Sequence, residues 1–375
     1  VFGTTYILTA RTVHRRVEYL IELVVNRGVF LRRSDSVSTA FSENRDKYGE
    51  WQPAELPQPG GLFRWPPRLR AVLSYFFGKE GLVYSVNALY VALAVLSWLF
   101  LTPSMERMAT LSIDWVALIF ARNTALLVII AGGLHLRLYT KRQQGTRYKY
   151  SAKWLATENK KFLFGHQTWD NVFFSIVSGC TIWTAYEVLA LWGYANGMWP
   201  MITLRESPVY FVLLMFGTLI FRHVHFYLIH RLIHFKPLYR ISHYVHHKNV
   251  NVGPWSGLSM HPLEHLLYFS GVLIHFIVPS HPVHAIFHLM HAGLAPASGH
   301  SGYHAYEVGS PKEDGERPAL EVGDYYHYLH HRYFTVNYGN TGFPIDKWFG
   351  SYHDGTPEAQ ERMNRRRSRR RTKGA

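Results

Sequence analysis

Residues 209–234, VYFVLLMFGTLIFRHVHFYLIHRLIH, join a long apolar run directly to a pair of histidines. A helix needs about 20 apolar residues to cross the hydrocarbon core of a bilayer, and residues 209–229 supply that length. His230 and His234 are four residues apart, so they lie on one face of the helix where it leaves the membrane. The stretch therefore predicts a transmembrane helix with a candidate metal site at its end.

Other apolar segments predict that much of the remaining chain is also helical and embedded in a membrane. Three of them, at 83–101, 115–138 and 172–195, are long enough to span. Two shorter ones, 263–279 and 283–297, fit either a helical hairpin that dips into the membrane or two short spans. We expect an all-α integral membrane helical bundle of about four spans plus a short membrane hairpin, with a histidine-rich di-metal domain on its cytoplasmic face.

Charged residues inside the predicted spans are few, and Arg122 and Glu187 are two of them. An intramembrane arginine is costly and is usually functional or paired. A tilted helix from which Arg122 reaches the membrane surface explains the residue equally well, so both interpretations stay open.

Composition divides the chain into four predicted parts. Residues 1–80 form an N-terminal soluble leader, and 81–204 hold membrane spans and a basic loop. Residues 205–355 form a histidine-box di-metal catalytic domain, and 356–375 form a basic C-terminal tail.

The formal net charge of +15 is concentrated beside the apolar spans. One basic group lies between two spans and consists of Lys141, Arg142, Arg147, Lys149, Lys153, Lys160 and Lys161, and a second occupies 365–371. This placement is typical of the positive-inside bias and of contact with anionic lipid, and no nucleic-acid-binding motif accompanies it. We therefore expect a membrane rather than a nucleic acid as partner, with the basic loop, the histidine clusters and the tail all on the cytoplasmic side. The single Cys180 excludes an internal disulfide and a cysteine-based zinc site.

Histidines are concentrated in the second half of the chain, because all of the 23 except His14, His135 and His166 lie between residues 223 and 353. Eight of them form three clusters, HRLIH (230–234), HYVHH (243–247) and HYLHH (327–331). Spacings of three and four residues on a helix aim neutral imidazoles at a common point, which suits a first-row metal. Eight ligands exceed what one ion uses, so the pattern predicts two ions held by His230, His234, His243, His246, His247, His327, His330 and His331.

These clusters resemble those of the sterol desaturase and fatty acid hydroxylase superfamily of membrane non-haem di-metal oxygenases. The resemblance covers roughly residues 205–355 and also rests on HYLHHRYFTVNYG (327–339) and DKWFGSYHDG (346–355). FKPLYRISHYVHH and GPWSGLSMHPLEH are most similar to the sterol C-5 desaturase branch, while HSGY (300–303) resembles the C-4 methylsterol oxidases. The first 200 residues show no such resemblance, and the acidic residue often found ahead of the first cluster is absent.

The resemblance implies further site residues. The family's His-x-x-x-His pair falls on His300 and His304, which raises the ligand set to ten, and its HP-(I/L)-E element makes His261 an accessory ligand. Metal-bound imidazoles usually donate their second N–H to an acceptor, and Glu264 and Asp346 are our candidates for that role.

The resemblance also implies the chemistry. Such a site takes two iron ions and O2, and desaturates or hydroxylates a lipid, most simply a sterol; imidazole sites also accept zinc on isolation. The chain has no haem or flavin motif, so electrons are expected from a donor such as cytochrome b5 or a ferredoxin. The expected location is the endoplasmic reticulum in a eukaryote, the inner membrane in a bacterium, or an organelle membrane.

Two questions stay open at this stage. A catalytically silent family member, serving as a structural or lipid-binding subunit of a membrane complex, is the alternative function. His281, His284, His288 and His291 follow one helix face. They either line a polar path to the site or are structural histidines satisfied by hydrogen bonds.

Overall fold

The computed structural model describes residues 45–46, 49–53, 56, 66, 68–78, 86–311, 317–340 and 343–373. Most of the predicted leader (1–80) lies outside this part of the chain, as do residues 83–85 of the first predicted span. In the leader, the described elements are the helix α2 (Leu69–Phe77) and short extended pieces around Trp51.

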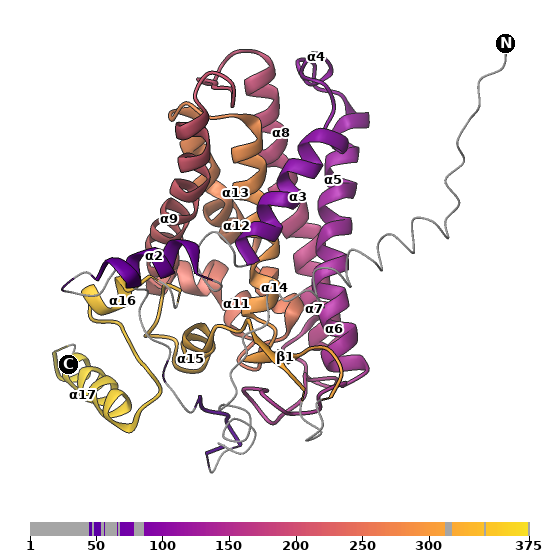
Figure 1. The fold of residues 1–375 in the computed structure, drawn as a ribbon. Helices are drawn as coiled ribbons and strands as arrows, with labels where there is room; N and C mark the ends of the chain where they lie inside the picture. Colours follow the sequence, from indigo (N-terminus) through magenta and orange to yellow (C-terminus); the bar gives the residue numbers. More distant parts are fainter. Residues whose placement is uncertain are drawn as a thin grey trace.

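A bundle of long helices forms the upper part of the molecule (Figure 1). Three continuous helices are long and apolar enough to cross a membrane, namely Ile113–Thr140, Gln167–Ala195 and Pro208–Ile233. The first comprises α5 (Ile113–Leu127), η2 (Val128–Gly132), α6 (Gly133–His135) and η3 (Leu136–Thr140). The second comprises α7 (Gln167–Phe173), η5 (Phe174–Cys180) and α8 (Thr181–Ala195), and the third is α9. The predicted helical membrane bundle is confirmed, and these helices match three of its four expected spans.

The first predicted span is described from Val86 onward. Its described helix, α3 (Val86–Phe100), has 15 residues and is therefore about 22 Å long, shorter than a hydrocarbon core of about 30 Å. The short helix α4 (Met105–Met108) follows it, with Ser104 as its N-cap.

The predicted membrane hairpin lies inside the bundle. It consists of α12 (Pro262–Phe269), the 3-10 helix η8 (Ser270–Phe276) and α13 (Pro282–Leu294). All 13 residues of α13 are buried, and the helix packs against α3, α8 and α9. Gly293 allows the close approach to α8, since a Cβ there would lie 2.5 Å from the ring of Trp183. An apolar helix of this length is thus part of the core, as burial on all sides requires.

A buried ion pair joins two of the spans. Arg122 on α5 pairs with Glu187 on α8, and Asn123 donates to the same carboxylate at 3.0 Å. The Arg122 and Glu187 side chains are 3% and 0% exposed. Of the two interpretations of Arg122, pairing is therefore correct, and the side chain does not reach the membrane surface.

Short elements are gathered at one end of the bundle, below it in Figure 1. They are α10 (Lys236–Leu238), η6 (Tyr239–His243), α11 (Tyr244–His247), η7 (Pro254–Leu258), α14 (Pro296–Gly299), α15 (Tyr325–Tyr333) and α16 (Ile345–Trp348). The strands β1 (Ala305–Glu307) and β2 (Ala319–Glu321) pair antiparallel here, with Ala305 opposite Glu321. The basic loop, which contains η4 (Leu163–Gly165), reaches the same end through a bridge between Lys149 and Tyr303.

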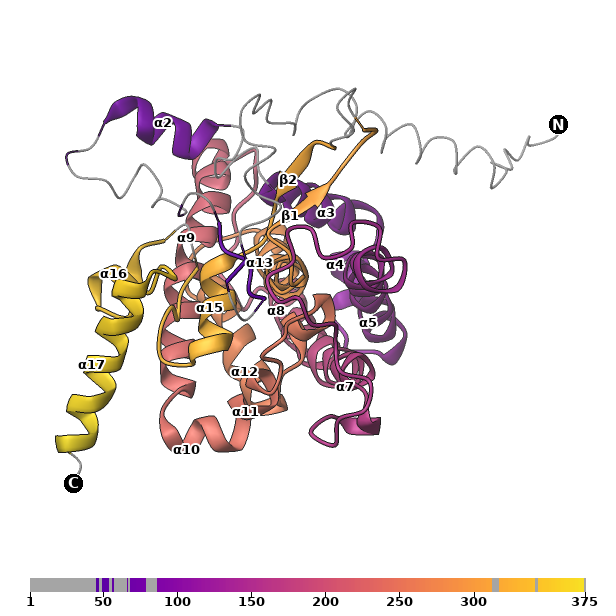
Figure 2. The ribbon, with the colours of Figure 1, turned by 90° about the horizontal axis from the view of Figure 1, so that it is seen from below.

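The basic tail forms helix α17 (Pro357–Lys373), which also lies at this end of the molecule (Figure 1) and, seen from below, to the left of α9 and α15 (Figure 2). The guanidinium of Arg367 donates to the carbonyl of Tyr333 at the end of α15, at 2.7 Å. The histidine-bearing elements, the basic loop and the tail therefore share one end of the bundle, as the charge distribution predicts.

Candidate metal centre

Two groups of histidines converge at the lower end of the bundle, and each group could hold a metal ion. The first, here called cluster one, comprises His230, His234, His243, His247 and His330. The second, cluster two, comprises His246, His300, His327 and His331. Within each cluster the candidate ligand atoms lie within 4.8 Å of one another, and every member except His234 is buried.

The sequence clusters divide between the two spatial clusters. In HYVHH, His243 and His247 belong to cluster one and His246 to cluster two; in HYLHH, His330 belongs to cluster one, while His327 and His331 belong to cluster two. Adjacent histidines on a helix point about 100° apart, so neighbours such as His330 and His331 serve different centres. The imidazoles of His247 and His331 nevertheless stack at 4.8 Å between ring centroids, which places the two clusters side by side.

The chain folds sharply between the first two sequence clusters. Helix α9 carries His230 in its last turn and ends with His234 at its C-cap. Pro237 occupies the first turn of α10, where its missing N–H is tolerated, and the chain then continues through η6 into α11. This turn brings His234 within 3.0 Å of His243, measured between their Nε2 atoms.

The spacing of nitrogens in cluster one fits a shared ion. The Nε2 atoms of His234 and His330 are 3.1 Å apart, as are those of His234 and His247, and those of His247 and His330 are 3.0 Å apart. Two ligands about 2.1 Å from one ion lie about 3.0 Å apart when they meet at right angles, and about 3.4 Å apart in a tetrahedron. The spacing therefore fits a shared ion with more than four ligands, and cluster one offers five imidazoles.

Protein acceptors hold the second ring nitrogen of three of the five imidazoles in cluster one, whereas His247 Nδ1 is buried without a partner among the described residues. His243 Nδ1 lies 2.7 Å from Glu264 Oε1, and His230 Nδ1 lies 2.7 Å from the carbonyl of Tyr338. His330 Nδ1 lies 2.5 Å from the carbonyl of Val336. A carbonyl or carboxylate accepts from Nδ1–H, so these contacts select the tautomer that leaves an Nε2 lone pair free for a metal.

Cluster two has weaker outer contacts and unpaired nitrogens. His246 Nδ1 is 3.4 Å from the carbonyl of Ser259, and His300 Nδ1 is 3.2 Å from the Ser256 hydroxyl. Both ring nitrogens of His331 are buried and have no hydrogen-bond partner among the residues that the structure describes. Buried polar atoms are normally satisfied, so these nitrogens fit ligation by an ion.

Burial favours the neutral form of the cluster imidazoles that lie outside the spans. Burial, and next the neighbouring imidazoles, lowers the pKa of His243, His247, His330 and His331 well below the ordinary 6.5. Burial likewise lowers the pKa of His327 to about 3. Neutral imidazole is the form that binds metal, so the fold prepares both clusters for ligation.

The three accessory candidates have different surroundings. Glu264 contacts a cluster imidazole directly, as described above, whereas Asp346 acts through the backbone. Its carboxylate accepts from the N–H groups of Tyr338 and Gly339 at 2.9 and 2.7 Å, and so fixes the carbonyl that contacts His230. His261 is the N-cap of α12, and its Nδ1 accepts from the N–H of Leu263 at 3.2 Å. The predicted accessory ligand is thus a helix cap in this structure.

His304, the tenth predicted ligand, belongs to neither cluster. Its ring stacks on Trp51 at 4.7 Å, and its Nε2 lies 3.9 Å from Glu321. The reason is local: His300 follows α14, whereas His304 directly precedes β1, so the pair does not share a helix face. We correct the expected ligand set to nine histidines.

Each histidine of the stripe at 281–291 makes at least one hydrogen bond, although His291 Nδ1 is buried without a partner among the described residues. His281 caps α13, His284 contacts the carbonyl of Phe211 at 2.9 Å, and His288 contacts His275 at 3.3 Å. His291 Nε2 lies 2.9 Å from Asn87 Oδ1. Of the two interpretations of the stripe, these contacts favour the structural one, although His291 also borders the cavity described next.

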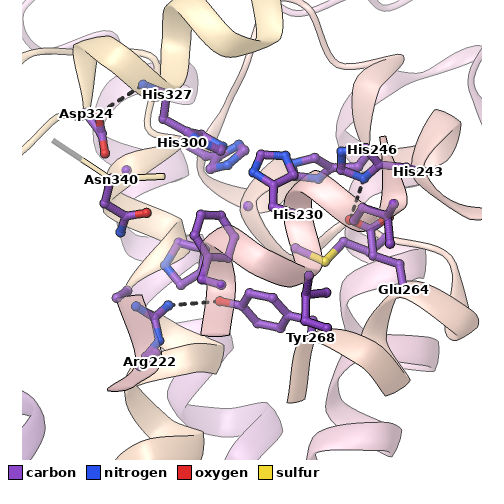
Figure 3. A pocket seen from close by; sticks show the side chains of 18 of the residues that line it. Arg222, His230, His243, His246, Glu264, Tyr268, His300, Asp324, His327 and Asn340 are labelled. Carbon is purple, nitrogen blue, oxygen red and sulfur yellow. Dashed lines mark hydrogen bonds and ion pairs between the residues drawn. The ribbon is translucent and has the colours of Figure 1, made fainter. Parts of the chain in front are cut away.

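A cavity of about 110 Å³ extends from the clusters into the bundle (Figure 3). His230, His243, His246, His300 and His327 border it. Arg222 and Tyr268 lie at the opposite side in Figure 3, with Asn340 and Asp324 along one wall. No sequence pattern had assigned these four residues to the site. Arg222, Phe226 and His230 follow one another at four-residue intervals and so lie on one face of α9. This spacing could have indicated that Arg222 shares the face of the candidate ligand His230.

Comparison with known proteins agrees with this site. The fatty acid hydroxylase family matches residues 214–351, which contain all nine clustered histidines. A putative Delta(7)-sterol-C5(6)-desaturase 2 of Arabidopsis thaliana is 31% identical over 110 residues, 29% of this chain and 36% of the relative. A Delta(7)-sterol-C5(6)-desaturase of Nicotiana tabacum is 29% identical over 158 residues, 42% of this chain and 53% of the relative. The chain thus spans about a third to a half of these relatives, and no solved structure matches it.

Proposed function

This chain belongs to the sterol desaturase/fatty acid hydroxylase superfamily, and from that premise we propose that it is a membrane-bound, O2-dependent di-iron oxidoreductase acting on a lipid. The observation that carries the proposal is the pair of adjacent all-histidine clusters beside a cavity that enters the bundle. The names of the two relatives make a Δ7-sterol the first substrate to test.

The nine histidines would hold the two ions, five in cluster one and four in cluster two. Bound iron would supply reductive activation of O2 and removal of hydrogen from an unactivated C–H bond. Desaturation converts a CH–CH unit, O2, two electrons and two protons into a double bond and two waters. Hydroxylation consumes the same electrons and protons and gives an alcohol and one water.

The protein's own groups orient the ligands and exclude water. Glu264 and the carbonyls of Tyr338 and Val336 fix the imidazole tautomers. Apolar side chains, among them Phe226 and Met260, line the cavity between the histidines and the bundle interior. A cavity with apolar side chains beside the histidines suits a lipid carbon held against the clusters.

The electrons would come from a separate donor, such as cytochrome b5 or a ferredoxin. The end of the bundle that carries the clusters also carries the basic loop and α17, whose side chains include the exposed Arg365 and Arg366. A basic surface attracts an acidic partner and speeds its encounter at low salt. We place the donor-docking face at this end.

The alternative, a silent subunit of a membrane complex, explains the site less well. A structural protein has no need for nine imidazoles, eight of them buried, that converge in two groups, and buried polar groups without partners destabilise a fold. The unpaired nitrogens of His331 are therefore the clearest argument for a working metal site.

The proposal is tested with purified protein loaded anaerobically with Fe(II) in lipid vesicles and supplied with a reduced donor. Addition of O2 should convert a Δ7-sterol, or another lipid from a screened set, to a product that has lost two hydrogens or gained one oxygen atom. His331→Ala should abolish the product, whereas His304→Gln, a matched change outside both clusters, should retain it. Failure of every lipid class with iron-loaded protein would favour the silent subunit.

A further inference from the structure

Arg222 is a buried cation with no acidic partner. The residue is 7% exposed in the middle of α9, and its Nε has no hydrogen-bond partner. Its one described contact is from NH2 to the hydroxyl of Tyr268, at 3.0 Å. No ion pair joins it to a carboxylate in the described ranges, whereas the other buried arginine of the spans, Arg122, is paired with Glu187. A buried, unpaired charge is unfavourable, so this guanidinium requires an acceptor.

The cavity supplies the place for that acceptor. Arg222, Phe226 and His230 follow one face of α9 and all line the cavity. Eight residues separate Arg222 from His230, which corresponds to about 12 Å along the helix. Figure 3 shows Arg222 and Tyr268 on one side of the cavity and the labelled histidines on the other.

We propose that Arg222 binds an oxygen acceptor of the lipid substrate, a carboxylate above all, and so sets which carbon lies against the metal clusters. This inference rests on the proposed function, in that the cavity is taken to be the substrate site. The free Nε and the two terminal nitrogens of a guanidinium form a fork that matches a carboxylate, whose charge would also compensate the buried cation.

The distance along α9 restricts the substrate. The Cα positions of Arg222 and His230 are separated by about 12 Å along α9, so we expect a substrate oxygen held by the Arg222 side chain to lie several bonds away from a carbon oxidised beside the histidines. The matching lipids carry their oxygen remotely, as in a long-chain acid or a sterol oxygenated on its side chain.

Two other polar residues of the cavity wall, Asp324 and Tyr268, are poorly suited to bind a carboxylate. Asp324 accepts from the backbone N–H of His327 at 3.0 Å and is the N-cap of α15. Its negative charge would repel a carboxylate rather than bind it. The hydroxyl of Tyr268 already donates to the carbonyl of Ala292 at 2.8 Å, so it cannot donate to a ligand as well.

The test measures lipid binding without turnover. Metal-loaded protein in nanodiscs, under argon and without reductant, is titrated with a radiolabelled long-chain acid and with the alcohol and hydrocarbon of the same length. The same titration uses a side-chain sterol acid and its parent sterol, which distinguishes the two lipid sources. The wild-type protein should bind at least one acid about tenfold or more tighter than its uncharged counterpart, as expected for a charge-assisted bond.

Variants separate recognition from a structural role. Arg222→Gln should remove the preference for the acid, and Arg222→Lys, which keeps the charge but loses the fork, should retain part of it. Tyr268→Phe, which removes the only described protein partner of Arg222, and Arg122→Lys, at the paired arginine, should both keep the preference. If Arg222→Gln does not fold, the proposal is tested by comparing the acid preference of Arg222→Lys with that of the wild-type protein.

The outcomes separate the two proposals. Equal binding of acid and uncharged lipid by the wild-type protein, or an undiminished preference in a folded Arg222→Gln variant, would overturn the role of Arg222. Arg222-dependent binding supports the inference even if no lipid is oxidised on addition of O2, an outcome that would refute only the proposed function. Loss of the acid preference in Tyr268→Phe as well would assign Arg222 a structural role.

Discussion

A change at Glu264 should distinguish the two clusters, because this carboxylate contacts an imidazole of cluster one. Its Oε1 lies 2.7 Å from His243 Nδ1, and the two side chains are 3% and 1% exposed. Its other oxygen is buried without a partner in the described part of the chain, so the carboxylate is committed to this one imidazole. His243 belongs to cluster one, and within the described part of the chain no hydrogen bond or ion pair joins Glu264 to a histidine of cluster two. Changing Glu264 should therefore weaken the binding of one ion and leave the binding of the other unchanged.

The size of the effect follows from the bond. A buried hydrogen bond to a charged group contributes about 1.5–3 kcal/mol, and losing an outer partner of a metal-bound histidine lowers metal affinity about 10- to 100-fold. These estimates agree, because a tenfold change corresponds to about 1.4 kcal/mol. Glu264→Gln, which can still accept from Nδ1–H, should give a loss near the lower end. Glu264→Leu should give a loss near the upper end.

The assay is a competition titration of the loaded protein with a chelator, followed by elemental analysis of the retained metal. In Glu264→Leu, one of the two ions should be bound more weakly than in the wild-type protein by the factor given above, while the affinity for the other ion should be unchanged. Glu321→Gln, near His304 and outside both clusters, is the matched control and should behave as wild type. Equal weakening of both ions in Glu264→Leu, or no weakening of either, would refute the assignment of Glu264 to cluster one.

Three further predictions concern the fold. Arg122→Leu leaves Glu187 buried and unpaired, so it should lower the free energy of unfolding in mixed micelles by about 3–5 kcal/mol. The double variant Arg122→Leu/Glu187→Leu should recover most of the lost stability, and equal stabilities of the single and double variants would contradict the pairing. Gly193→Ala places a Cβ 1.7 Å from Nε1 of Trp199 and should cost about 1–3 kcal/mol, with a shift in tryptophan fluorescence; an unchanged melting temperature would show that Trp199 moves freely. Burial lowers the pKa of Lys149 from 10.5 to about 7, so the unfolded chain binds more protons between these pH values and stability should rise with pH there, by up to about 1.4 kcal/mol per unit. Lys149→Met should remove this slope in pH-dependent thermal unfolding, and a slope equal to that of the wild-type protein would contradict it.

The sequence was most informative where its signals are local. Apolar length predicted the helices at 113–140, 167–195 and 208–233, because a bilayer imposes its thickness on the chain. Histidine spacing likewise indicated metal ligands, and pairs four residues apart, such as His243 and His247, do share a cluster, whereas pairs three residues apart, such as His243 and His246, are divided between the two clusters. Burial of α13 on all sides was not predictable from its own residues, because an apolar helix faces lipid or protein with the same composition.

The division of ligands between the clusters lay beyond the sequence for a physical reason. His246 and His247 are adjacent in the chain but serve different clusters, and the partners of each come from other elements, such as His300 after α14 and His330 on α15. Family resemblance supplied His304 by spacing alone. The chain turns into β1 directly after it, so the ring stacks on Trp51 instead.

The most direct test of the central claim is the metal content of protein purified anaerobically and loaded with Fe(II), compared among three chains. The wild-type protein should retain two irons per chain. His247→Ala, in cluster one, and His331→Ala, in cluster two, should each retain about one, and the two single variants should differ in which ion is lost, as judged by the spectrum of the remaining site. A single ion in the wild-type protein, or metal content indifferent to both changes, would contradict two separate histidine centres.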